Sequence, residues 1–434
     1  MSSSSTFSVH PVAYGHALLD LFQLSSDYTN LNSGSFGVLP KYVAEACDTL
    51  NAEIESNPDR FIRTELGHRL NQARIRLASY LGVPPSSCVL VTSVAAGINT
   101  ILRNIQWSTT DIILLPTTSY YTITRNVHEI SEQTLPPRIQ PIDFTLPSCT
   151  SSILSQFKVE VSKAVDSLTH TPGERTHAHP RSPKVVALFD SIVSTPGLLL
   201  PWKSMVQICK ENGVLSIVDA AHSIGQEQDL NLEDADPDFW ISNCSKWLYA
   251  KRGCAVLYIP ERNQSIIHAA VPPSLPYLPA TGDEETSAFV DQFYWSGSFD
   301  IASLLSAPAA LEFRKSIGGD ACIADYCQSL ASRGGRMLAE ILSTEIMELS
   351  GEGKQPEISM INVKLPLPDT ITPSAHITRS FQSKLLVTHR IYAAHFYYNK
   401  SWWVRLQMQD FERLGRALLS TCAEIAEEEA GRQQ

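Results

Sequence analysis

The sequence predicts an α/β protein with a large domain, built on a mostly parallel sheet, and a smaller C-terminal α+β domain. Continuous apolar runs, for example at residues 185–189 and 214–218, are typical of strands buried on both faces of a parallel sheet. Helical stretches alternate with these runs along the chain, which favours βαβ connections. We therefore expect a ligand crevice at the carboxyl ends of the strands.

The composition is that of an ordinary globular protein. The chain has 434 residues, 43% of them hydrophobic, which is enough for one large domain and a smaller one. A net charge of −11 disfavours nucleic acid as a partner. The nine cysteines form no C-x-x-C pair, so we expect reduced thiols in a cytoplasmic protein without a metal site. Because the N-terminus lacks a secretory signal and no apolar stretch approaches the roughly 18 residues of a membrane span, we expect no membrane partner.

The first elements lead to a possible anion site. A short helix is expected at residues 15–24, and residues 31–40 form either a loop with exposed amides or a plain turn. Helical spacing covers residues 41–80, with a break at 57–58. The strand at 88–91 runs through small residues into a helix, and such a helix N-terminus can bind a phosphate. A simple strand-to-helix connection is the alternative.

The alternation continues to the end of the chain. A strand at 111–115 delivers Tyr120 to its carboxyl end, where an aromatic ring can stack on a flat cofactor or simply pack. Residues 131–150 are rich in proline, and residues 170–183 have the composition of a surface loop. The other predicted elements are helices at 153–168, 201–213, 301–317, 320–343 and 411–429, strands at 185–189, 214–218, 239–241, 254–259, 358–365 and 402–406, and a connector at 260–290.

Lys246 and Asp219 carry the first indication of function. Lys246 follows the apolar run at 239–241 and precedes an aromatic residue, which is a poor position for a solvated charge. Asp219 closes another apolar run at the same edge of the sheet. Pyridoxal phosphate needs a lysine for its Schiff base and a carboxylate that keeps its ring nitrogen protonated. Arg405 suits the carboxylate of a substrate.

Several motifs support this interpretation. The sequence DAAH at 219–222, followed by NCSKW at 243–247, resembles the class V aminotransferase family, also called the cysteine desulfurase-like family. The stretches LNSGSFG at 31–37, KRGCA at 251–255 and MINV at 360–363 are similar to the branch of isopenicillin N epimerase and fungal hercynylcysteine sulfoxide lyase. The likeness covers about residues 30–415.

The resemblance implies a pyridoxal phosphate-dependent transferase of fold type I, active as a homodimer with its site at the subunit interface. It implies an N-terminal arm and helix at 1–30, a large cofactor-binding domain at 31–300 and a small domain at 301–434. The catalytic residues would be Lys246, Asp219 and His222. By position, the implied cofactor-binding residues are Lys246, Asp219, His222, Tyr120, Ala95, Ala96, Ser194, Ser245 and Ser298, and the implied substrate-binding residues are Asn32 and Arg405.

Two positions depart from the family pattern. Ser245 stands where the branch usually has a histidine, and a hydroxyl cannot serve as an imidazole acid or base. The phosphate turn usually carries threonines, whereas Ala95 and Ala96 offer only backbone amides. The resemblance favours β-elimination at a carbon–sulfur bond of an amino acid derivative. Epimerisation, condensation of the kind found in fungal alkaloid pathways and transamination are alternatives, and a non-catalytic protein of this fold is the least favoured one.

Overall fold

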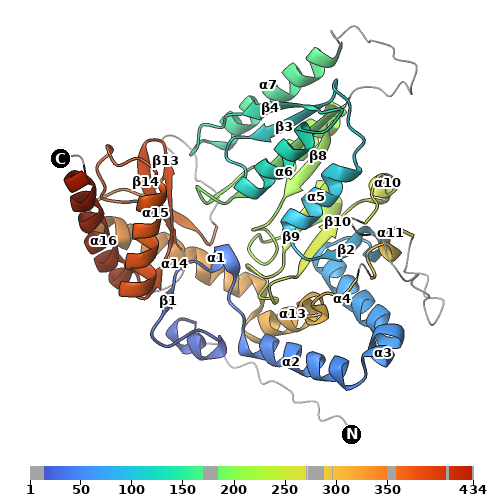
Figure 1. Ribbon diagram of the computed structural model, residues 1–434, viewed down its shortest axis with the longest axis horizontal. Coiled ribbons are helices and arrows are strands. Elements are labelled where there is room, and N and C mark those ends of the chain that lie inside the picture. The colour runs from blue at the N-terminus through green and yellow to red at the C-terminus, as the bar shows by residue number, and fades with distance from the viewer. Residues whose placement is uncertain are drawn as a thin grey trace.

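The computed structural model describes residues 14–169, 184–269, 271, 288–295, 297–348, 358–406 and 410–432. It has a large domain with a seven-stranded sheet and a C-terminal domain with a three-stranded sheet (Figure 1). The predicted surface loop at 170–183 and most of the predicted connector at 260–290 lie outside the described residues. No described helix is long and apolar enough to cross a membrane, and the described residues contain no group that could hold a metal ion.

The large sheet is mostly parallel, as predicted. Its strand order is β2-β10-β9-β8-β5-β3-β4, and only β10 runs antiparallel to its neighbours. The strands are β2 (Cys88–Val91), β3 (Ile112–Pro116), β4 (Arg138–Ile142), β5 (Val185–Asp190), β8 (Leu215–Asp219), β9 (Phe239–Asn243) and β10 (Ala255–Tyr258). The proline-rich residues 131–150 therefore hold an edge strand, β4, that the sequence did not predict.

Alternate residues of each inner strand enter two different cores. In β3, Ile112 and Leu114 belong to one hydrophobic cluster, and Ile113 and Leu115 belong to another. Because both faces are covered, nearly every position of such a strand is apolar, with Ser216 in β8 and Ser242 in β9 as buried exceptions, which explains the long apolar runs in the sequence. One face carries α5 (Val94–Asn104) and α6 (Tyr121–Ser131), which lie side by side, and the other carries α7 (Thr150–Thr169) and α8 (Trp202–Glu211) (Figure 1).

The N-terminal segment differs from the prediction in two places. The short helix is the 3-10 helix η1 (His16–Leu21), and a one-turn helix, α1 (Ser33–Phe36), lies within the predicted loop. The predicted break near residue 57 is confirmed, because the Asn57 side chain accepts the Arg60 N–H and starts a new helix. The elements here are β1 (Thr29–Asn30), α2 (Lys41–Ser56), α3 (Pro58–Arg60), the π-helix η2 (Phe61–Glu65) and α4 (Leu66–Leu81).

The C-terminal domain packs two long helices and a shorter one on an antiparallel sheet. The sheet order is β11-β14-β13, so β14 lies in the middle. The predicted helix at 301–317 is two helices, because Pro308 begins a new one. These two helices, α12 (Ile301–Leu304) and α13 (Ala307–Ser316), pack on α2 and α4 and bury their apolar residues in the core of the large domain. The elements that follow are α14 (Gly319–Leu342), β11 (Ile361–Lys364), α15 (Ala375–Gln382), η4 (Ser383–Thr388), β12 (Ile391–Tyr392), β13 (Ala394–Tyr398), β14 (Ser401–Leu406) and α16 (Phe411–Arg432).

The N-terminal segment also joins the C-terminal domain. Strand β1 pairs in parallel with β12, and Leu31 is buried in the hydrophobic cluster of the C-terminal domain. This pairing carries the chain directly into α1, between the two domains (Figure 1). The short elements of the large domain not yet named are η3 (Pro85–Ser87), β6 (Ile192–Val193), β7 (Leu198–Leu199), α9 (Leu232–Ala235), α10 (Glu261–Gln264) and α11 (Ala288–Asp291).

Candidate active site

Titratable side chains gather at the carboxyl ends of the parallel strands, as the sequence predicts. Asp190 and Asp219 are the last residues of β5 and β8, and Lys246 lies in the turn that follows β9. These three strands are neighbours in the sheet. Parallel strands bring their carboxyl ends to the same edge, so side chains that are far apart in the sequence meet there.

Lys246 contacts His222 directly. The Lys246 Nζ atom lies 3.1 Å from His222 Nε2, and Trp247 Nε1 donates to His222 Nδ1 over 3.3 Å. An indole N–H is only a donor, so Nδ1 is the acceptor and the proton of the neutral ring sits on Nε2. Burial lowers the pKa of His222 well below its ordinary value, and the nearby charges of Lys246 and Arg405 lower it further. The imidazole is therefore neutral, with its Nε2–H facing the lysine.

Lys246 has an amine suited to chemistry near neutral pH. Burial lowers its pKa to about 8, against an ordinary value of 10.5, while Asp219 opposes the shift and Arg405 adds to it. A neutral amine is a nucleophile and a base, whereas an ammonium ion is neither. The same burial that makes Lys246 a poor surface charge makes it a usable catalytic group.

Asp219 and Asp190 are both buried, each 3% exposed. Asp219 Oδ1 accepts the backbone N–H of Ala221 over 3.0 Å. Burial raises the pKa of Asp219, whereas that hydrogen bond and the charge of Lys246 lower it. Burial also raises the pKa of Asp190 well above its ordinary value, and the neighbouring Asp219 adds to this shift. The sequence analysis did not single out Asp190 as a site residue.

Arg405 reaches from the middle strand of the C-terminal sheet into the same region. Its Nη1 donates to the carbonyl oxygen of Ser194 over 2.7 Å, and its Nη2 donates to Asn32 Oδ1 over 3.1 Å and to Ser35 Oγ over 2.9 Å. The side chain is buried, yet no carboxylate pairs with it among the described residues. Burial lowers the pKa of Arg405 to about 10. A buried guanidinium without a counter-anion is an attractive site for an anionic ligand.

The α1 segment packs directly on the turn after β9 that carries Lys246, which we call the catalytic turn. Gly37 has φ +72°, and a Cβ atom there would lie 1.8 Å from the Ser245 carbonyl oxygen. Only glycine fits this backbone conformation at such a distance. The predicted glycine-rich stretch at 31–37 therefore brings Asn32 and Ser35 to Arg405. The contact with Gly37 uses the backbone of Ser245 and does not depend on its side chain.

Hydrogen bonds between the two domains fix the turn that carries Ser194. Asn362 on β11 accepts the Gly197 N–H and donates to the Gly197 carbonyl oxygen, over 2.9 and 3.1 Å. A Cβ atom on Gly197 would lie 3.0 Å from Arg405 Cδ. The motif at 360–363 thus fixes the turn that carries Ser194. The Ser194 hydroxyl accepts a hydrogen bond from Arg405 over 3.1 Å.

The N-terminus of α5 carries the two backbone amides predicted for the phosphate, at Ala95 and Ala96. Asn243 Oδ1 accepts the Val94 N–H over 3.1 Å, and Ser93 caps the helix by accepting the Ala96 N–H over 3.1 Å. The Ala95 N–H has no such acceptor within the described part of the chain. Of the two predicted amides, the one at Ala95 is therefore open to a ligand and the one at Ala96 is already engaged.

Several buried polar atoms at this edge lack a hydrogen-bond partner among the described residues. They are Thr118 Oγ1, Ser119 Oγ, Asp190 Oδ2 and Arg405 Nε. Buried polar atoms are nearly always paired in folded proteins, so a group of unpaired ones at one edge indicates a missing polar ligand. Pyridoxal phosphate, with a phosphate, a ring hydroxyl and a ring nitrogen, offers partners of the required kinds. The residues present therefore fit this cofactor.

Two predicted residues stay untested by the geometry. Tyr120 precedes α6 and is 55% exposed, and none of its ring contacts reaches Lys246 or Asp219. Ser298 lies in the segment between α11 and α12. The sequence analysis missed Asp190, Trp247 and Ser35. A signal existed for each of them: Asp190 closes an apolar run in the way that Asp219 does, and Trp247 and Ser35 lie within the motifs at 243–247 and 31–37.

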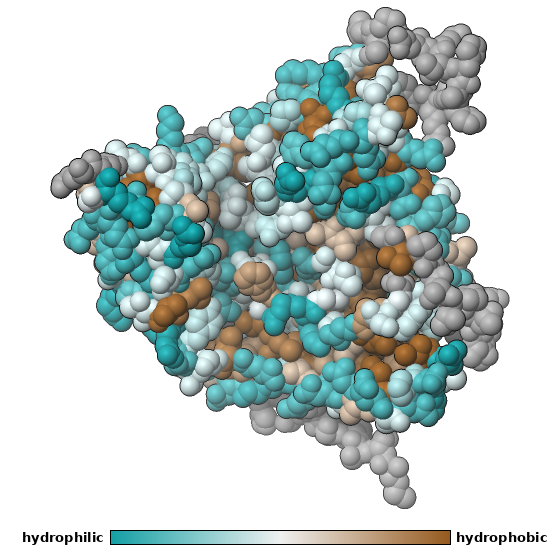
Figure 2. Space-filling view, in the orientation of Figure 1, coloured by the Kyte–Doolittle hydropathy of each residue, from teal (hydrophilic) through white to brown (hydrophobic). Residues whose placement is uncertain are grey.

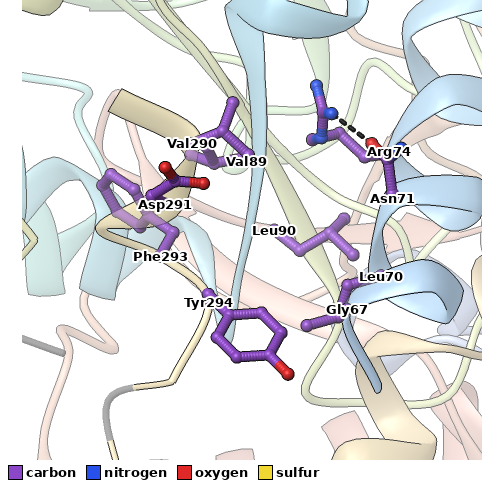
Figure 3. Close-up of a pocket in the computed structure, with 10 residues that line it drawn as sticks. All are labelled: Gly67, Leu70, Asn71, Arg74, Val89, Leu90, Val290, Asp291, Phe293 and Tyr294. Atoms are coloured by element: carbon purple, nitrogen blue, oxygen red, sulfur yellow. Dashed lines mark hydrogen bonds between the residues drawn. The ribbon is translucent and has the colours of Figure 1, made fainter. Parts of the chain in front are cut away.

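Two cavities lie outside this group of residues. A small pocket of about 40 Å³ lies between α4, β2 and α11, with Leu70, Leu90 and Phe293 in its wall (Figure 3). A larger cavity of about 460 Å³ lies beneath η1 and shares the wall residue Trp247 with the site. Neither cavity includes Lys246 or Asp219 in its lining.

Comparisons with known proteins show the family and the fold of this chain. Residues 154–372 match the model of the family Aminotransferase class-V. The chain is 32% identical to an L-cysteine desulfhydrase-like protein of Epichloe uncinata, over 97% of this chain and 98% of the relative. It is 29% identical to the hercynylcysteine sulfoxide lyase of Schizosaccharomyces pombe, over 94% and 98%. Its fold is similar to that of the cystine C-S lyase C-DES, with a TM-score of 0.68 and 18% identity over 92% and 98% of the two chains.

The pKa of Lys246 makes uptake of pyridoxal phosphate depend on pH. Because only the neutral amine attacks an aldehyde, the rate at which cofactor-free protein takes up pyridoxal phosphate should rise with pH and reach half its maximum near pH 8. Stopped-flow absorbance across a pH series measures this rate. A half-maximum near the ordinary lysine value of 10.5 would contradict the assignment.

Proposed function

As the chain belongs to the class V aminotransferase family, we propose that it is a pyridoxal phosphate-dependent lyase that cleaves a carbon–sulfur bond in a cysteine derivative. The single observation that carries the substrate class is Arg405, a buried cation without a carboxylate partner among the described residues, close enough to affect the pKa of Lys246. An amino acid brings both groups that this pair requires, a carboxylate for Arg405 and an α-carbon proton for Lys246.

Different residues of the site would bind different parts of the cofactor. Lys246 would hold its aldehyde carbon, Asp219 would face its ring nitrogen, and the open Ala95 N–H at the start of α5 would receive its phosphate. When bound, the cofactor supplies a ring that draws electrons from the α-carbon of the substrate. Tyr120 is assigned to stacking on that ring, Ser194 to the region of its hydroxyl and Ser298 to the phosphate in the neighbouring subunit.

The reaction requires one proton to leave the α-carbon and the sulfur substituent to leave the β-carbon. Lys246 is suited to take the α-proton, because its pKa of about 8 lies near neutral pH. His222 is neutral and 3.1 Å from Lys246, so it orients the amine without adding a second positive charge. Asn32 and Ser35 hold Arg405 in place for the substrate carboxylate.

The names of the full-length relatives favour elimination over the other reactions. The relatives matched over at least 94% of this chain carry names of a desulfhydrase-like protein or a sulfoxide lyase. The isopenicillin N epimerase of Streptomyces clavuligerus matches over 78% of this chain, at 28% identity. Epimerisation, condensation and transamination remain the alternative outcomes of the experiment below.

We further propose that the enzyme is a cytoplasmic homodimer. All nine cysteines are free, which suits a reducing compartment. Large apolar side chains are exposed on the large domain, among them Phe36 and Tyr121. Figure 2 shows hydrophobic patches over the large domain, whereas the C-terminal domain is mainly hydrophilic in the same view. Exposed apolar patches of this kind are typical of surfaces that a partner covers.

A substrate screen tests the reaction. Purified protein loaded with pyridoxal phosphate should release ammonia, pyruvate and a sulfur-containing fragment in equal amounts from L-cysteine or a cysteine sulfoxide. Lys246→Ala should lose this activity together with the visible absorbance band of the lysine-bound cofactor. Lys158→Ala, at an exposed position of α7, is the control that should keep both.

Each other outcome of the screen points to a different reaction. Release of neither pyruvate nor ammonia would sink the lyase assignment. Uptake of solvent deuterium with the substrate retained would indicate an epimerase, and dependence on an added keto acid would indicate an aminotransferase. A product that contains a second partner would indicate a condensing enzyme.

Arg405→Lys should weaken binding of the substrate carboxylate. A lysine keeps the charge but loses the two-pronged geometry, and hydrogen bonds to charged groups are worth about 1.5–3 kcal/mol, so affinity should fall roughly 10- to 100-fold. Titration with the amino acid and with its carboxamide tests this, because the preference for the carboxylate over the carboxamide should be smaller in the variant than in the wild-type protein. The visible absorbance band should persist, which shows that the variant is folded. An unchanged preference would contradict the role of Arg405.

The exposed apolar surface around Phe36 predicts that a charged residue there will weaken the homodimer. Phe36→Asp should shift the mass in solution from dimer towards monomer, because a buried charge at an interface is costly. Val387→Asp is the matched control, since Val387 in the C-terminal domain is 72% exposed and Phe36 is 71% exposed. Light scattering after gel filtration measures the mass. A monomeric wild-type protein, or equal effects of the two variants, would contradict the proposed interface.

A further inference from the structure

Asp190 is a buried carboxyl group to which the proposed reaction gives no role. It ends β5, and its partner in the β-sheet register is Asp219, at the end of β8. Registered residues of parallel neighbours stand side by side, about 4.8 Å apart, with their side chains on the same face of the sheet. The two carboxyl groups therefore project together into the crevice.

The surroundings of the pair differ. Asp219 Oδ1 accepts the Ala221 N–H over 3.0 Å, which stabilises the ionised form of Asp219. Asp190 Oδ2 has no hydrogen-bond partner in the described parts of the chain, and no cation there forms an ion pair with Asp190. The charged groups that act on Asp190 are Asp219 and Lys246. The Ser119 side chain, in the loop after β3, is the hydrogen-bonding side chain that acts on Asp190, and it lowers the pKa of that carboxyl group.

Two adjacent carboxylates in a buried site do not both ionise, because their repulsion adds to the cost of desolvation. The charge belongs on Asp219, whose Oδ1 accepts the Ala221 N–H, and the proton belongs on Asp190, whose Oδ2 has no partner among the described residues. This agrees with the raised pKa of Asp190, which has burial as its main cause and Asp219 as the next.

We propose that Asp190 is a positioning residue that holds one proton beside Asp219, so that the two carboxyl groups together carry a single negative charge. As a neutral carboxyl group, Asp190 is a hydrogen-bond donor and steadies the Asp219 carboxylate towards the ring nitrogen of the cofactor. A single charge also limits how far the pair raises the pKa of Lys246, since both carboxylates would act on that amine if both were ionised. The role in cofactor binding rests on the proposed function, whereas the shared proton does not.

Asp190→Asn and Asp219→Asn form a matched pair, because they make the same change at registered positions of neighbouring strands. The midpoint pH for uptake of pyridoxal phosphate reports the charge near Lys246, which also depends on Arg405. Asp190→Asn replaces a neutral donor by a neutral donor and should leave the midpoint unchanged. Asp219→Asn removes a real charge and should lower the midpoint by about 1 to 3 pH units. Equal downward shifts in both variants would overturn the proposal.

Infrared spectroscopy of the cofactor-free protein gives an independent reading. The wild-type protein at neutral pH should show the carbonyl stretch of a protonated carboxyl group, and Asp190→Asn should lose it. If Asp190 is ionised, any such band comes from another carboxyl group and will not change in Asp190→Asn. An unchanged band would therefore also overturn the proposal. Because this measurement needs no cofactor, it distinguishes failure of the shared proton from failure of the proposed function.

A variant without a donor separates positioning from packing. Asp190→Ala should weaken cofactor binding about 10-fold in equilibrium dialysis, while Asp190→Asn should retain wild-type affinity. Asp190→Ser, a smaller neutral donor, replaces Asp190→Asn if that variant does not fold. Equal losses of affinity in the alanine variant and in the donor-bearing variants would show that Asp190 only fills space and would refute the positioning role.

Discussion

The structure depends on one buried guanidinium. Arg405 starts in the middle strand of the C-terminal sheet and donates to the Ser194 carbonyl and to Asn32 and Ser35 near α1, so one side chain connects three segments that are far apart in the sequence. Burying such a charge costs several kcal/mol unless hydrogen bonds and a counter-charge compensate it. The chain supplies the hydrogen bonds and leaves the counter-charge to a ligand. The closed arrangement of the two domains and the capacity to bind an anion thus have the same physical origin.

The net charge around Lys246 depends on which of the neighbouring side chains carry a proton. Arg405 and a partly charged Lys246 supply positive charge, and Asp219 supplies the negative charge between them. A protonated imidazole would add a third cation, and the Trp247 N–H bonded to Nδ1 already fills the position that such a proton needs. His222 therefore stays neutral, and the lysine amine alone changes its protonation near neutral pH.

Most of the large sheet could be predicted from the sequence, because a strand buried on both faces has few polar positions and forms a mainly apolar run. Edge strand β4 could not be predicted, because it carries Arg138 and Pro141 and is partly exposed. The strand-end pattern was sufficient to find Lys246 and Asp219. It could not assign Asp190, because a single sequence does not show that β5 and β8 are neighbours in register. The role of Trp247 depends on where an indole nitrogen points, which no spacing rule encodes.

Gly37 has a consequence for how distant sequences can be sorted. Its positive φ angle and the 1.8 Å gap between its virtual Cβ atom and the Ser245 carbonyl mean that one added methyl group would push the α1 segment off the catalytic turn. Asn32 and Ser35 would move with that segment and leave Arg405 without two of its acceptors. A chain that keeps a lysine equivalent to Lys246 but lacks this glycine therefore cannot close its site in the same way. A hydrogen atom in place of a side chain is thus as diagnostic of this architecture as the reactive amine.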